Sequence, residues 1–274
     1  MSRILVGTDG TAPATVAVRW AAGAAAALDA ELIVATVIPH GTDEAHVHEA
    51  HRALHTRWSA PASAGGQPFR SLVLHGDPRQ MLHDVSESEQ VILTVLGTTG
   101  EGWYPALHLG STGHHIAEHV TRPLAIIPPG TGSFHVDHIV LGVDGSPGSL
   151  AAVAWCCELA ARTKASVQVV HAHQPGARAG TSTDPADWRD EAERHCREWA
   201  GPLQVLGHLG SVVVVDDDPA RAIHGRADDA DADLVVIGSR GTGGFHGLRL
   251  GSVALKLLHH ATRPTVIVPP PQPS

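Results

Sequence analysis

A glycine loop between an apolar run and a helical pattern occurs twice in this chain, and this repeat constrains the fold most. The second copy spans residues 238–252 and reads Gly-Ser-Arg-Gly, nine residues, then Gly-Ser, behind the apolar run 234–237. The first copy spans residues 97–111, 141 residues earlier, behind the apolar run 91–96. Glycines let backbone N–H groups approach a ligand, and a helix start presents unpaired donors at its positive end. Each copy therefore predicts a strand, a loop suited to a phosphate chain, and a helix.

The match between the two halves extends along their length. Residues 4–11 correspond to residues 139–146 at an offset of 135, and from His75 onwards the offset is 141. Six residues are therefore gained between the first helix and the third strand of the second half, where a loop or a second helix absorbs them.

The length of 274 residues exceeds what one core usually serves, so the sequence predicts two domains. We expect the first at residues 1–129, a linker at 130–137, the second at 138–270 and a Pro-rich tail at 271–274.

Each half alternates short apolar runs with amphipathic stretches, which indicates an α/β fold with a parallel sheet covered by helices on both faces. Strands are predicted near residues 3–8, 31–38, 70–75, 91–96 and 123–127, and near 138–143, 166–172, 211–215, 234–237 and 264–268. First-half helices are predicted near residues 13–28, 43–59, 78–88 and 111–121.

The composition narrows the functional classes. The formal net charge is −9 without a Lys or Arg cluster, which argues against nucleic-acid binding. The chain enters its first apolar run at Ile4, and no apolar run approaches the roughly 18 residues of a membrane span, so we expect a cytoplasmic protein. Three cysteines, an odd number without CxxC spacing, are expected to be reduced core thiols.

Two aspartates end the first strand of each half, Asp9 and Asp144. In an open parallel sheet the ligand crevice lies beyond the carboxyl ends of the strands, where the strand order reverses. If strands one and four are neighbours, each Asp meets a glycine loop there and accepts hydrogen bonds from a base or ribose. Alternatively, the Asp-Gly-Thr and Asp-Gly-Ser segments simply cap the first helix. The sequence leaves both interpretations open.

The doubled Gly-x-x-Gly, nine residues, Gly-Ser pattern, the strand-one Asp and the closing Arg-Pro before the last strand resemble the universal stress protein family in its tandem two-domain form. The resemblance implies two doubly wound domains, each with five parallel strands in the order 3-2-1-4-5, and ATP binding. It implies a first site at Asp9, Val37, Gly97, Gly100, Gly110, Ser111 and Thr112, and a second at Asp144, Ala172, Gly238, Gly241, Gly251, Ser252 and Val253. The resemblance implies that the Val and Ala touch the base, the Asp the base or ribose, and the loop the phosphates.

The two loops differ in charge. The second contains Arg240, Arg249 and His246, whereas the first contains Glu101 and the bulky run 103–105. Because Arg pairs with phosphate and a carboxylate repels it, we expect the second site, including Arg240, to bind ATP more tightly.

Other chemistries are discounted. Histidines share a helix spacing at His48, His51 and His55, and at His114, His115 and His119, yet HExxH and finger spacings are absent, so we expect no metal site. Neither GxxxxGK[ST] nor GxGxxG after the first strand is present, and no general base is marked near the phosphates, so we name no catalytic residue.

Three functions remain open. The first is an ATP-binding sensor or regulator of the stress response, acting through an unidentified protein partner or its own assembly. The second is a slow ATP hydrolase or phosphoryl-transfer enzyme, which would need Mg²⁺. The third is a scaffold in which only the second site works. The apolar fifth strands, at 125–127 and 266–268, need pairing or cover, so we expect the halves to pack edge to edge and two chains to form a homodimer.

Overall fold

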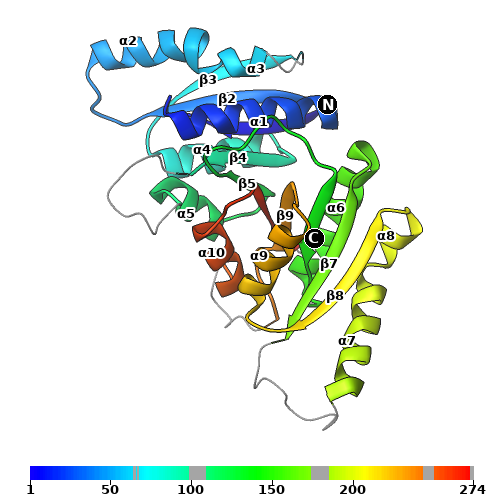
Figure 1. Cartoon of the computed structure of the whole chain (residues 1–274). Coiled ribbons are helices and arrows are strands. Elements are labelled where there is room, and N and C mark those ends of the chain that lie inside the picture. Colours follow the sequence, from blue (N-terminus) through cyan, green and yellow to red (C-terminus); the bar gives the residue numbers. More distant parts are fainter. Residues whose placement is uncertain (64–65, 67, 99–108, 174–184, 243–249, 272–274) are drawn as a thin grey trace. The chain divides into compact units, whose positions relative to one another are not determined.

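The computed structural model describes residues 1–274 except 64–65, 67, 99–108, 174–184, 243–249 and 272–274 (Figure 1). It contains two compact units, one built around Met1–His135 and one around Val136–Leu257. The domain limits 1–129 and 138–270 stay a prediction.

The first unit is a five-stranded parallel sheet with its helices. In chain order, its elements are β1 (Ser2–Gly7), α1 (Ala12–Leu28), β2 (Ala30–Ile38), α2 (Glu44–Ala53), the π-helix η1 (Leu54–Trp58), α3 (Ala60–Ser63), β3 (Phe69–His75), α4 (Pro78–Ser88), β4 (Leu93–Gly97), α5 (Ser111–Glu118) and β5 (Leu124–Ile127). The pairs β3–β2, β2–β1, β1–β4 and β4–β5 are all parallel, which gives the order 3-2-1-4-5.

The second unit repeats this arrangement. Its elements are β6 (His138–Gly142), α6 (Pro147–Thr163), β7 (Ser166–His173), α7 (Pro185–Trp199), α8 (Gly201–Val205), β8 (Leu209–Asp216), α9 (Pro219–Asp229), β9 (Leu234–Gly238), α10 (Ser252–His259) and β10 (Thr265–Val268). Its strands pair in parallel in the order β8-β7-β6-β9-β10. The predicted α/β fold with two 3-2-1-4-5 sheets is therefore confirmed.

Helices α1 and α6 pack closely against the sheets because most residues on their buried faces have small side chains. On α1, Ala17, Ala21 and Ala24 recur at helical spacing and are fully buried, and Trp20 is 1% exposed. The Trp20 ring meets Phe134 edge-on at 4.9 Å between centroids. Proline occupies the first turn of α1, α4, α6, α8 and α9, where a missing N–H costs nothing.

One predicted helix differs from its expectation. The stretch 43–59 is α-helical only to Ala53 and then widens into the π-helix Leu54–Trp58. Both the N–H and the hydroxyl of Ser59 donate to the Leu54 carbonyl, at 3.2 and 2.5 Å, which closes the five-residue turn. The widened turn sets the position of Trp58.

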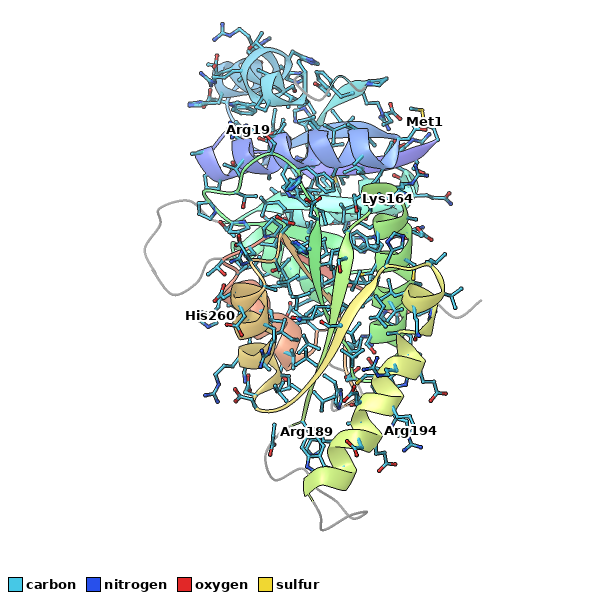
Figure 2. The ribbon with its side chains drawn as sticks, turned by 45° about the vertical axis from the view of Figure 1, so that its right-hand side comes forward. Met1, Arg19, Lys164, Arg189, Arg194 and His260 are labelled. Atoms are coloured by element: carbon cyan, nitrogen blue, oxygen red, sulfur yellow. The ribbon has the colours of Figure 1, made fainter. Side chains whose placement is uncertain are left out.

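The outer faces of the helices are charged. Figure 2 shows Arg189 and Arg194 along α7, both exposed.

The three cysteines, Cys156, Cys157 and Cys196, are buried and free, and burial raises the pKa of the Cys196 thiol to about 12. Across the described residues, the helices are too short or too polar to cross a membrane.

Candidate functional site

In the second unit, the strand-one aspartate contacts the glycine loop directly. Because β6 pairs with β9, the residues that follow these strands emerge side by side at their carboxyl ends. The backbone N–H of Thr242 donates to Oδ2 of Asp144 at 2.8 Å, and the Ser146 N–H donates to Oδ1 at 3.0 Å. Asp144 therefore caps the start of α6 and also holds the loop, and its contact with a base or ribose stays a prediction.

The loop also rests on the first turn of α6. The Ser146 hydroxyl donates to the Arg240 carbonyl at 3.0 Å. A Cβ on Gly238 would lie 2.5 Å from the carbonyl carbon of Gly148, and a Cβ on Gly241 would lie 2.4 Å from Asp144 Oδ2. Both glycines are thus required by packing of the loop against α6 and its aspartate, whatever the loop binds.

The far end of the loop leads into α10. The Gly251 N–H donates to the Ser239 carbonyl at 2.8 Å, which brings the two ends of the loop together. Ser252 begins α10 and is exposed, and Val253 is half-buried. The first N–H groups of a helix lack intrahelical partners, so α10 presents donors next to the loop. Arg240 is exposed there, whereas His246 and Arg249 lie outside the described residues.

In the first unit, Asp9 follows β1 and is exposed. Its Oδ1 atom accepts from the N–H and the hydroxyl of Thr11, at 3.0 and 2.6 Å, which is the capping arrangement. Gly97 packs like its counterpart, since a Cβ there would lie 2.7 Å from the Pro13 carbonyl oxygen.

Most of the first loop lies outside the described residues, including Gly100, Glu101 and the run 103–105. The description resumes at Leu109, after which Gly110 caps α5, whose first residues are Ser111 and Thr112. The charge difference between the loops therefore stays a prediction.

The strand-two residues lie near the same ends of the sheets. Val37 pairs with Leu74 and Ala172 with Val215, each close to the carboxyl end of its strand. Both are half-buried. Beside Ala172, the His171 ring donates through Nδ1 to the Val143 carbonyl at 2.8 Å, immediately before Asp144.

Two tryptophans at the crevice were missed by the sequence reasoning. Trp58 and Trp199 lie against Gly10 and Gly145, the glycines that follow the two aspartates, with φ angles of 80° and 77°. A Cβ on either glycine would overlap the indole, at 2.2 and 2.5 Å. A repeated Trp-x-x-Pro at the offset of 141 was the available signal. Each tryptophan therefore supports the turn that carries its aspartate.

Two buried hydroxyls follow the first glycine of each loop, those of Thr98 and Ser239. Their exposed fractions are 5% and 1%, and neither oxygen has a hydrogen-bond partner among the described residues. Buried hydroxyls are normally paired, so their orphaned state at the loop is compatible with a bound polar group.

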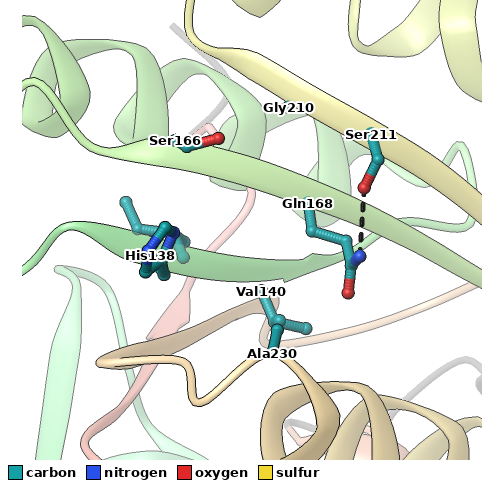
Figure 3. Close-up of a pocket in the computed structure, with 8 residues that line it drawn as sticks. His138, Val140, Ser166, Gln168, Gly210, Ser211 and Ala230 are labelled. Carbon is teal, nitrogen blue, oxygen red and sulfur yellow. Dashed lines mark hydrogen bonds between the residues drawn. The ribbon is translucent and has the colours of Figure 1, made fainter.

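A separate cavity of about 260 Å³ lies at the opposite ends of the strands in the second unit (Figure 3). His138 and Ser166, the first residues of β6 and β7, line it together with Gln168, whose amide donates to the Ser211 hydroxyl at 3.0 Å. Because it lies at the amino ends of the strands, it is distinct from the crevice.

Comparison with known proteins identifies the family. The model of the universal stress protein family matches residues 1–128 and again residues 135–269. The chain belongs to the universal stress protein family. A universal stress protein of Mycobacterium tuberculosis is 29% identical over 309 residues, covering 98% of this chain and 95% of the relative.

Solved structures agree on the fold. A universal stress protein from Archaeoglobus fulgidus superimposes with a TM-score of 0.73 at 19% identity, covering 97% of this chain and 98% of that one. A putative universal stress protein from Pseudomonas aeruginosa superimposes with a TM-score of 0.64 at 16% identity, covering 98% of this chain and 93% of that one.

Proposed function

We infer that this universal stress protein binds ATP at the carboxyl ends of its strands and that site occupancy reports the energy or stress state of the cell. The observation that carries this proposal is the bond from Thr242 N–H to Asp144 Oδ2. It joins the strand-one aspartate to the glycine loop at the strand-order reversal, and the bond from Gly251 N–H to the Ser239 carbonyl brings the start of α10 to the same loop.

The described residues support the binding of a nucleoside triphosphate. The loop N–H of Thr242 donates to an anionic oxygen of Asp144, and the hydroxyls of Ser239 and Thr98 are buried without a hydrogen-bond partner among the described residues. The exposed guanidinium of Arg240 offers a charge for phosphate.

Each part of the second site has a role. Asp144 accepts from the base or ribose hydroxyls, and Ala172 contacts the base. The loop from Gly238 to Gly241, with Gly251, Ser252 and Val253, surrounds the phosphates, and Arg240 pairs with them. ATP would supply the polyanion that these backbone donors and Arg240 bind. We place the corresponding first site at Asp9, Val37, Gly97, Gly100, Gly110, Ser111 and Thr112.

The wider role follows from this binding. Two chains associate as a homodimer in the cytoplasm, and a regulatory protein partner reads the nucleotide-bound form. Nucleic acid and membranes are not partners in this proposal, because the chain is acidic, with a formal net charge of −9.

Calorimetric titration with ATP tests the relative strength of the sites. Gly241→Asp puts a carboxylate against Asp144 and the phosphates, and it should weaken binding more than Gly100→Asp does. Gly225→Asp is the matched control, since nothing lies within 4 Å of a Cβ at that exposed position, and it should bind like the parent. A larger loss from Gly100→Asp would contradict the ranking of the two sites.

A further inference from the structure

A cluster of three side chains able to ligate a metal lies at the carboxyl end of α5, on its last turn and its C-cap residue. His115, Glu118 and His119 each offer one ligand atom, and these atoms lie within 4.8 Å of one another. Among the described residues, no other three His, Cys, Asp or Glu side chains come together in this way. The segment reads His-x-x-Glu-His, the reverse order of the HExxH spacing.

The helix itself aligns the two imidazoles. Residues four apart lie on one face, and two histidines at this spacing are a recognised zinc-binding arrangement. The rings of His115 and His119 are stacked, with centroids 4.2 Å apart and planes 28° apart. Each side chain is half-buried, so the pair is held in place yet remains accessible to solvent.

A hydrogen bond orients the His119 ring for ligation. Its Nδ1 atom lies 2.8 Å from the His115 carbonyl oxygen, and because a carbonyl only accepts, Nδ1 carries the hydrogen. The neutral ring then keeps its lone pair on Nε2. Metal-bound histidines commonly donate their other ring N–H to a carbonyl or carboxylate in this way.

Glu118 is available as the third ligand. Its carboxylate lies 3.4 Å from His114 Nε2, but the two side chains are 43% and 39% exposed. Exposed ion pairs contribute little free energy, so Glu118 gives up this contact at small cost. On α4, Arg79 is paired with the N-cap residue Asp77 at 2.6 Å, and at His115 the guanidinium disfavours a positive charge more than the Asp77 carboxylate favours one.

The second unit provides a comparison within the same chain. At the offset of 141, Lys256 stands where the first unit has His115, whereas Asp218 matches Asp77, and the lysine Nζ lies 2.7 Å from Asp218 Oδ2. A lysine ammonium repels metal ions and offers no lone pair. Among the described residues, the three-ligand cluster is therefore found in the first unit.

The geometry points to a Zn²⁺ site formed by His115, Glu118 and His119, with a fourth position left to water. Nitrogen and carboxylate oxygen ligands suit zinc, and three protein ligands leave one tetrahedral position open. His115 lies four residues, or about 6 Å along the helix, beyond Ser111, and none of the three ligands is among the residues assigned to the nucleotide.

Zinc titration of the whole chain by calorimetry, after chelator treatment, tests the proposal. We expect one Zn²⁺ per chain in the tightest class, lost in the double variant His115→Gln/His119→Gln. Glu118→Gln should weaken it by about tenfold or more. His115→Lys, which copies the second unit, should also abolish it. Circular dichroism verifies that each variant is folded.

The matched control is His51→Gln/His55→Gln. These histidines have the same four-residue spacing, but His55 lies in the π-helix, and they belong to no described three-ligand group. This variant should keep the tight site. The proposal is overturned if the parent binds no zinc, if His115→Gln/His119→Gln binds within twofold of the parent, or if both double variants lose the metal equally.

Discussion

The backbone N–H of Thr242 donates a 2.8 Å hydrogen bond to Oδ2 of Asp144, which lies 98 positions earlier in the chain. Neither residue reaches the other through local structure. The parallel pairing of β6 with β9 brings them together, because it places the ends of the first and fourth strands side by side. A strand-end carboxylate and a glycine loop thereby become one site.

Asp144→Asn tests the role of this carboxylate. The amide keeps the size of the side chain but removes its charge and one acceptor, so ATP affinity should fall about tenfold, or about 1.4 kcal/mol. Asp9→Asn should cost less, and Asp190→Asn, on exposed α7, should cost nothing. Calorimetric titration measures all three. Unchanged affinity in Asp144→Asn would remove the aspartate from the proposed site.

Gly238→Ala tests the packing of the loop on α6. The new methyl would lie 2.5 Å from the carbonyl carbon of Gly148, so we expect a loss of about 1–3 kcal/mol in the free energy of unfolding. Gly225→Ala, in the open on α9, should instead stabilise by up to about 1 kcal/mol. Chemical denaturation compares them, and equal stability of the two variants would contradict the close approach.

Trp199 should report on the site, since its indole contacts the Gly145 turn next to Asp144. We expect ATP to change the intrinsic fluorescence of the protein, and Trp199→Phe to lose most of that change. Trp20→Phe, buried on α1 against Phe134, is the control and should keep it. If Trp20→Phe abolishes the change while Trp199→Phe does not, Trp199 is not coupled to the site.

Asp218 links stability to pH. It caps α9 and bonds Lys256, and these contacts lower the pKa of its carboxyl below 3.8, the Lys256 bond most. A lowered pKa stabilises the fold above the unfolded value, and this stability is lost as the pH falls through the folded value. Asp218→Ala should therefore cost about 1 kcal/mol at pH 7 and much less near pH 2. Denaturation at both pH values measures the difference, and an equal cost at both would argue against the linkage.

The repeat made the fold predictable because the two halves of the chain show the same order of apolar runs and amphipathic stretches. Strand β1 was expected at 3–8 and is found at Ser2–Gly7, and the strand order followed from the family resemblance. The π-helix was not predictable, since it depends on two bonds from Ser59 to Leu54 that leave no periodic trace.

The candidate site was predictable only as residue types. The sequence placed Asp144 at the end of the first strand and Gly241 in the loop that follows the fourth, but their contact depends on the backbone path of the loop. Trp58 and Trp199 were not predictable as site residues, because a tryptophan in a helical pattern usually belongs to the hydrophobic core. Their contact with glycines of positive φ appears only in three dimensions.

The central claim, that this chain holds ATP at the glycine loops, is tested most directly by equilibrium dialysis of the whole protein against labelled ATP. The account predicts between one and two ATP retained per chain, with the tighter site lost in Gly241→Asp and kept in Gly225→Asp. No ATP retained at about 1 mM by a protein with native circular dichroism, a concentration equivalent to about 4 kcal/mol of binding, would contradict it.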